Sequence, residues 1–120
     1  MTLAIVDGVA QSIPTPGAAG PLPRSQVGFV KPTVQIYYAL TTDCVILCDY
    51  SGSDQQIILP TTGISAGKIY VVKNDGNPNP VDIENTVDGN AGPYQLYPAG
   101  KSSVILVWDG VSSYCILASF

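Results

Sequence analysis

The residues of this chain that could do chemistry are carboxylates and thiols, because the sequence contains no histidine. Histidine is the commonest general base and a frequent metal ligand, and its absence excludes Ser-His and Cys-His nucleophile pairs. Asp82 and Glu84 would share one face of a short strand, and a glycosidase could use them as its pair of carboxylates. Such charges are more typical of an exposed edge strand, where they prevent pairing with other chains. We therefore expect no enzyme activity.

The thiols of Cys44, Cys48 and Cys115 could form a disulfide or bind a metal ion. On one strand, Cys44 and Cys48 would lie about 13 Å apart at ~3.3 Å per residue, whereas a disulfide needs Cα atoms within about 7 Å. A metal site needs more ligands than these thiols offer. We expect three reduced cysteines that pack as small apolar side chains, with no metal and no cofactor.

The segment from Asp75 to Asn79 begins like a calcium-binding loop, with oxygen-bearing side chains at alternate positions. Pro80 then stands where that loop needs glycine, and Thr86 stands where it needs a bidentate glutamate. We expect a plain turn here.

Aromatic side chains could form a sugar-binding surface, since the chain has seven Tyr and one Trp. Their spread over separate predicted strands fits packing in a core or an interface better. Glycan binding is therefore the weaker interpretation. The residues are Tyr37, Tyr38, Tyr50, Tyr70, Tyr94, Tyr97, Tyr114 and Trp108.

The elements that would position these residues are short strands separated by Gly, Pro, Asn and Asp turns. Residues 34–120 predict an all-β domain, a small antiparallel β-sandwich or jelly-roll-like fold. Asp109-Gly110 is the strongest hairpin signal. The predicted strands are 34–40, 43–48, 55–59, 68–73, 81–83, 94–97, 102–108 and 113–118.

Residues 1–33 predict an extended arm rich in proline and glycine, which cannot form a helix or a central strand. The arm is also rich in apolar residues and poor in charge, unlike ordinary disordered segments. We expect it to bind along another protein, since exposing so many apolar groups to water costs free energy. The proposed contact residues are Leu3, Ile5, Val6, Val9, Ile13, Leu22, Val27 and Phe29.

The composition of the domain predicts an oligomer. Only 12% of the residues are charged, about half the usual fraction, and the best strands are apolar on both faces. An antiparallel sheet normally turns one face to water, so the second face needs a partner, as in a cyclic homotrimer. The proposed interface residues are Tyr70, Val72, Ile105, Val107 and Trp108.

Other partner classes are disfavoured. The net charge is −4 and the five cationic residues are scattered, so direct nucleic-acid binding is not expected. No apolar run approaches the ~20 residues of a membrane span. The first residues lack the basic region of a signal peptide, which favours synthesis in a cytoplasm.

The domain resembles a small trimeric β-module of tailed-bacteriophage structural proteins, found in head-decoration, head-fibre and tail-fibre proteins. The resemblance covers about residues 42–117 and leaves the arm out. It rests on Thr42-Asp43-x-Val45-Ile46-Leu47, Ile57-Ile58-Leu59-Pro60, Gly67-Lys68-Ile69-Tyr70-Val71-Val72-Lys73-Asn74, Val81-Asp82-Ile83 and Leu106-Val107-Trp108-Asp109-Gly110.

The resemblance implies a structural virion protein without catalytic residues. Fibre modules usually follow a longer shaft, and this chain shows no shaft repeat. We therefore expect a capsid decoration (cement) protein: a homotrimer on the capsid surface that binds the major capsid protein and stabilises the shell. The alternative is a head-fibre or tail-fibre module that binds host surface glycans.

Overall fold

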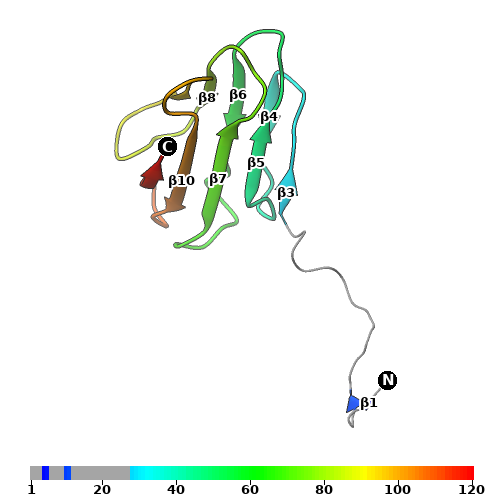
Figure 1. Cartoon of the computed structure of the whole chain (residues 1–120). Helices are drawn as coiled ribbons and strands as arrows, with labels where there is room; N and C mark the ends of the chain where they lie inside the picture. Colours follow the sequence, from blue (N-terminus) through cyan, green and yellow to red (C-terminus); the bar gives the residue numbers. More distant parts are fainter. Residues whose placement is uncertain (1–3, 6–9, 12–27) are drawn as a thin grey trace.

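The computed structural model describes residues 4–5, 10–11 and 28–120, where the regular structure is all β (Figure 1). The all-β class predicted from the sequence is confirmed. Two short strands, β1 (Ala4–Ile5) and β2 (Ala10–Gln11), pair in parallel with each other. The other strands form a five-stranded sheet and a four-stranded sheet. No helix in the described residues is long and apolar enough to cross a membrane.

The five-stranded sheet has the order β11-β10-β7-β5-β3. Its strands are β3 (Phe29–Val30), β5 (Val45–Cys48), β7 (Ile69–Asn74), β10 (Ser103–Trp108) and β11 (Tyr114–Ser119). The four-stranded sheet has the order β4-β6-β8-β9. Its strands are β4 (Ile36–Tyr38), β6 (Gln55–Ile58), β8 (Val81–Ile83) and β9 (Tyr94–Leu96).

From β3 to β8 the chain alternates between the two sheets, with each strand followed by one in the opposite sheet. Strands β3, β5 and β7 are therefore parallel neighbours, and so are β4, β6 and β8. Strands β9, β10 and β11 then add antiparallel pairs. The predicted antiparallel pairing is wrong for the first three strands of each sheet. These strands follow connections through the opposite sheet, and not the tight hairpins that join antiparallel neighbours.

One hydrophobic core joins the two sheets in a sandwich-like arrangement. Alternate residues of each strand point inward, as the period of a strand requires. The ring of Tyr114 packs against Trp108 and Tyr70, with centroid distances of 4.9 and 5.9 Å. The buried apolar residues are Ala39, Ile46, Cys48, Ile57, Leu59, Tyr70, Val72, Val81, Ile83, Val87, Leu96, Val104, Leu106, Trp108 and Tyr114.

The buried Asn85 side chain replaces a missing strand partner at Leu59. Its Oδ1 accepts a hydrogen bond from Leu59 N at 2.8 Å, and its Nδ2 donates to Leu59 O at 2.9 Å. Leu59 directly follows β6, and Asn85 lies in the loop after β8. The side chain of Asn85 therefore binds the N–H and C=O groups that a neighbouring strand would otherwise bind. The side chain thus satisfies two buried polar groups at once.

Residues 28–33 belong to the folded domain. Gly28 O accepts hydrogen bonds from the N–H groups of Cys44 and Val45, at 2.6 and 2.9 Å. Gly28 has a φ of 80°, and a Cβ there would lie 2.8 Å from Cys44 Cβ, so only glycine fits. The predicted boundary between arm and domain after residue 33 therefore cuts through a part of the domain.

The buried Gln55 side chain attaches the same segment from the other side. Its Nε2 donates to Pro32 O at 3.2 Å and to Val34 O at 2.9 Å, while its Oε1 accepts from Tyr50 N. These hydrogen bonds fix residues 32–34, which connect the short strands β3 and β4.

The hairpin predicted at Asp109-Gly110 is confirmed between β10 and β11. Asp109 Oδ1 accepts hydrogen bonds from the N–H groups of Val111, Ser112 and Ser113, at 2.7, 2.9 and 3.2 Å. These bonds, that from Val111 above all, hold the pKa of the Asp109 carboxyl below its usual value.

Candidate interaction surface

The outer side of the five-stranded sheet is an apolar surface made by residues that alternate with the core residues. In one row across the strands, Phe29 pairs with Val45, Val45 with Val71, and Val71 with Ile105. In a second row, Ile69 pairs with Val107 and Val107 with Cys115. We call these residues the apolar face: Phe29, Val45, Ile69, Val71, Ile105, Val107 and Cys115.

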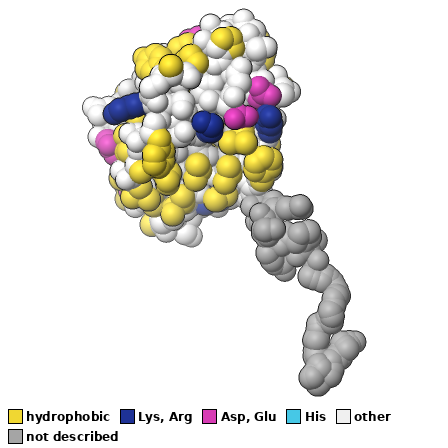
Figure 2. Space-filling view, viewed as in Figure 1, with side chains coloured by type: hydrophobic (Ala, Val, Ile, Leu, Met, Phe, Trp, Pro, Cys, Tyr) yellow, Lys and Arg dark blue, Asp and Glu magenta, His cyan; other side chains and the backbone are white. Residues whose placement is uncertain are grey.

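Figure 2 shows hydrophobic side chains gathered over the lower half of the domain, where Figure 1 draws β10, β7, β5 and β3. Phe29 is 57% exposed and Ile69 is 40% exposed. The other members of the apolar face are partly covered by their neighbours on the sheet. Lys73 marks one border of this surface, because it pairs with Leu47 and Ser103 in the next row. A contiguous apolar face of this kind is typical of protein–protein contact sites.

Of the five residues predicted for the interface, two lie on the apolar face and three lie in the core. Ile105 and Val107 lie on the apolar face. Tyr70, Val72 and Trp108 are buried in the core, with 0%, 0% and 3% of their surface exposed. They cannot contact a second subunit, since the four-stranded sheet covers them. Both faces of β7 and β10 are apolar, and the sequence alone does not show which face points inward.

The arm residues predicted to bind a partner lie mostly outside the described part of the chain. These are Leu3, Val6, Val9, Ile13, Leu22 and Val27. For Ile5 the structure describes the backbone pairing of β1 alone. Phe29, which was assigned to the arm, is the first residue of β3 and stands at the edge of the apolar face.

The two carboxylates that could act as a glycosidase pair lie on the outer side of the four-stranded sheet. Strand β8 is an interior strand between β6 and β9, so the edge-strand explanation of these charges is wrong. Asp82 is only 8% exposed and accepts a hydrogen bond from Gln95 Nε2 at 2.9 Å. Glu84 is exposed. Neither the pocket beside Asn74 nor the pocket beside Val87 includes one of these two carboxylates in its lining.

The three cysteines are free, and only one of them packs in the core as predicted. Cys48 is fully buried, and this burial, with a smaller effect of Asp75, raises the pKa of its thiol to about 12. Such a thiol is a poor nucleophile at neutral pH. Cys115 is partly exposed on the apolar face, and Cys44 is partly exposed beside Gly28.

Several titratable side chains gather around the buried Asp43. The Asp43 carboxylate accepts hydrogen bonds from Tyr37 Oη at 2.6 Å and from Leu40 N at 2.8 Å. Burial, with a smaller effect of Asp43, raises the pKa of Tyr70 to about 12. Lys68 Nζ donates to Asp43 O and lies 4.7 Å from the centre of the Tyr70 ring. Every group has a partner within the fold, so the cluster fixes the loop before β5 and leaves no free acid or base.

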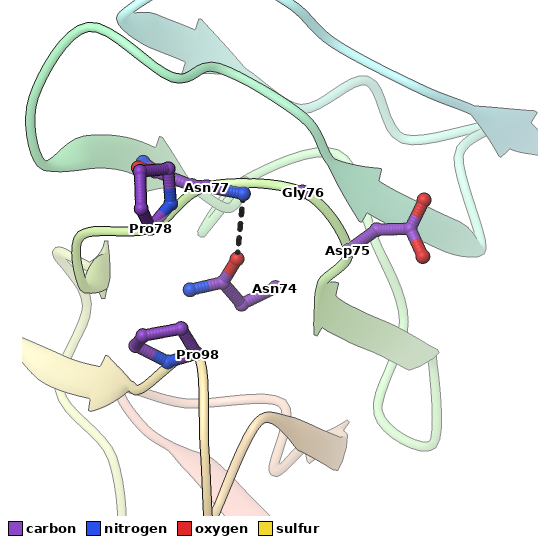
Figure 3. Close-up of a pocket in the computed structure, with 6 residues that line it drawn as sticks. All are labelled: Asn74, Asp75, Gly76, Asn77, Pro78 and Pro98. Atoms are coloured by element: carbon purple, nitrogen blue, oxygen red, sulfur yellow. Dashed lines mark hydrogen bonds between the residues drawn. The ribbon is translucent and has the colours of Figure 1, made fainter.

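A pocket of about 250 Å³ lies beside the turn between β7 and β8 (Figure 3). Inside the turn, Asn74 Oδ1 accepts from Asn77 N at 3.1 Å, and Asn74 Nδ2 donates to Asn79 O at 2.9 Å. Asn77 Oδ1 accepts from Asn79 N at 2.8 Å. These side chains bind the backbone of their own turn, which explains why the sequence looks like an incomplete calcium loop. The plain turn predicted from Pro80 and Thr86 is what the structure shows.

Asp75 points away from this pocket in Figure 3 and takes part in an ion-pair group instead. Lys31 Nζ lies 3.5 Å from Asp75 Oδ2 and 3.6 Å from Asp49 Oδ2. The three side chains are 30–47% exposed, so the pairs are screened by water and add little stability. They attach the first strand of the domain to the end of β7.

The described residues thus offer one extended apolar surface and no assembled catalytic group. The apolar face differs from the predicted interface because Val71 and Ile69 replace Tyr70 and Val72. Val71 and Ile69 are identified by the strand partners that they have in the sheet. A single sequence does not show which residues pair across strands. Comparison of the chain with protein-family models, with curated proteins and with solved structures finds no match.

Proposed function

We propose that this protein is a structural virion protein that decorates the outer surface of a capsid as a homotrimer and stabilises the shell. The observation that supports the proposal best is the apolar face. It lies outside a domain that already has a complete core of its own, so a second protein surface is needed to remove it from water. A homotrimer would cover it with copies of the same domain.

The residues before the domain would supply the second contact, to the major capsid protein. Their sequence combines proline and glycine with regularly spaced apolar residues. An extended segment of this kind can bind along another protein through backbone pairing and apolar side chains. Three such arms on one trimer would bind far more tightly than one arm, because the second and third binding events become intramolecular.

Deletion of residues 1–27 tests this division of labour, and it leaves the Gly28 contacts in place. We expect the shortened protein to keep the oligomeric state of the full chain and to lose co-sedimentation with capsids of the virus that carries its gene. The matched control is the full chain with Val111→Ala, a change at an exposed loop residue. Undiminished capsid binding after the deletion would show that the arm does not bind the shell.

The alternative, a head-fibre or tail-fibre module, would also be a trimer, but it would occupy a different place in the virion. Quantitative mass spectrometry of purified virions separates the two, since a decoration protein is present in proportion to the major capsid protein. A copy number proportional to tail proteins would reject the decoration function.

A further inference from the structure

The outer side of the four-stranded sheet differs in chemistry from the apolar face. Gln56 pairs with Asp82 and Asp82 with Gln95 across β6, β8 and β9. The alternate residues Ile57 and Ile83 are fully buried, so these three polar side chains point outward. We call Gln56, Asp82 and Gln95 the polar row. With Ile36 of β4 in the same register, the row extends about 14 Å at the usual ~4.8 Å strand spacing.

Asp82 is the unusual member of the polar row, because it is a carboxylate that is more than nine-tenths buried. Within the described residues, Gln95 Nε2 is the one donor to its side chain, and it binds Oδ1. Both ion pairs within these residues belong to Lys31, so Asp82 has no cationic partner among them. A buried charged group is costly unless donors satisfy it. Within the described residues, Oδ2 accepts no hydrogen bond, so this oxygen still lacks a donor.

The Gln95 side chain is held in one orientation by a second hydrogen bond. Tyr97 Oη donates to Gln95 Oε1 at 2.8 Å, and Gln95 Nε2 donates to Asp82 Oδ1. The relay fixes the positions of a phenol, an amide and a carboxylate before any ligand arrives, which lowers the entropy cost of binding.

Two exposed tyrosine rings flank the polar row. Tyr97 is 47% exposed and lies two residues beyond Gln95. Tyr38 is 68% exposed and lies two residues beyond Ile36, on the strand at the other edge. Each ring offers a flat apolar surface with a polar end. The sheet face thus combines hydrogen-bonding groups along its middle with aromatic rings at two of its corners.

We propose that this surface, the polar row with Tyr38 and Tyr97, binds a neutral oligosaccharide. Sugar hydroxyls donate and accept at once, and the amides of Gln56 and Gln95 offer both functions while Asp82 Oδ2 accepts. Tyrosine rings pack on the C–H faces of sugar rings. The carboxylates of Asp82 and the nearby Glu84 repel sialylated or sulfated sugars, which selects uncharged ones. The surface lies on the sheet opposite the apolar face, so it stays accessible when copies cover that face.

The test uses the full-length protein on an array of neutral, sialylated and sulfated oligosaccharides, followed by calorimetric titration of the neutral sugar that binds best. We expect binding to neutral members, with affinity that changes little between about 50 and 500 mM NaCl. Tyr97→Ala and Gln56→Ala should each weaken binding about tenfold or more, because each removes one contact type. Val111→Ala is the matched control and should bind normally.

Absence of neutral-sugar binding would overturn the proposal, and so would full affinity in both Tyr97→Ala and Gln56→Ala. Binding confined to charged sugars would also contradict it. If a Lys-rich peptide bound this surface with steep salt dependence, Asp82 would form an ion pair with a partner protein instead of binding a sugar. Circular dichroism of each variant confirms that the fold is kept. All these measurements use isolated protein, so their outcome is independent of whether the chain decorates a capsid.

Discussion

Ile105 lies directly opposite Val71 in the antiparallel pair of β10 and β7, and both side chains point away from the core. Val71 in turn pairs with Val45 on its other side, in parallel register. An apolar row therefore crosses three strands of a sheet whose inner face is already packed. The proposed homotrimer would bury these side chains, which lie outside the core of their own domain.

Ile105→Lys should dissociate the oligomer. The substitution places a charge at the centre of the apolar face and removes apolar area that is worth about 1.5–3 kcal/mol for a fully buried Ile side chain. We expect the dissociation constant to rise at least about tenfold. Sedimentation velocity over a range of protein concentrations measures it. Ile36→Lys, on the outer side of the other sheet, is the matched control and should leave the oligomer intact. A wild-type monomer at micromolar concentration would refute the interface.

Thiol labelling should report the state of the same surface. Cys115 pairs with Val107 on the apolar face, so we expect it to be protected from iodoacetamide in the oligomer and labelled in Ile105→Lys. Cys48 should stay unlabelled in both folded proteins at pH 8, because it is fully buried and its pKa is raised to about 12. Peptide mass spectrometry identifies each labelled thiol, and denatured protein provides the full-labelling reference. Equal labelling of Cys115 in both folded proteins would show that no subunit covers it.

Asn85→Ala should be strongly destabilising. It leaves Leu59 N and Leu59 O buried without partners, and each unsatisfied group costs about 1–3 kcal/mol. Urea unfolding followed by tryptophan fluorescence measures the loss in free energy of unfolding. Asn90→Ala changes an exposed asparagine in the same loop and should have a small effect. A similar loss for both variants would mean that the side-chain bridge to Leu59 is unimportant.

Asp109 should make stability depend on acid pH. Its pKa is lowered in the folded protein because it accepts three backbone hydrogen bonds, led by that from Val111. The stabilisation is therefore complete above the unfolded-state pKa of about 3.9 and is lost as pH falls through the lower folded value. Asp109→Asn should lose this part of the pH dependence in melting curves recorded between about pH 2 and 6. Asp54→Asn is the control at another exposed aspartate, and an identical change in both variants would reject the role of the turn.

The positions of β4 to β11 were readable from the sequence, because turn residues separate the runs of β-prone residues. The predicted run 81–83 coincides with β8, and the run 102–108 contains β10. The two-residue strand β3 was missed, since a pair such as Phe29-Val30 is too short to show a pattern. Its formation depends on Gly28 and on the long-range hydrogen bonds to Cys44 and Val45.

The direction of strand pairing was not readable. Short strands with turn signals suggested hairpins, and the Asp109-Gly110 hairpin is one. The connections after β3, β5 and β7 instead lead to the other sheet, which makes every second strand a parallel neighbour. A run that is apolar on both faces fits a buried parallel strand as well as an antiparallel strand whose outer face is covered, so the local sequence did not decide the direction.

By itself the sequence determined the all-β class, the positions of β4 to β11 and the apolar character of both faces of β7 and β10, because these depend on local composition and a period of two. Only the tertiary structure decided which of those faces is inside. It buried Tyr70, Val72 and Trp108, and it left Ile105 and Val107 outside with Val71. It also brought Gln56, Asp82 and Gln95 from three separate strands into one row. The physical reason is that strand register is set by long-range pairing, and a shift of one residue would exchange the two faces.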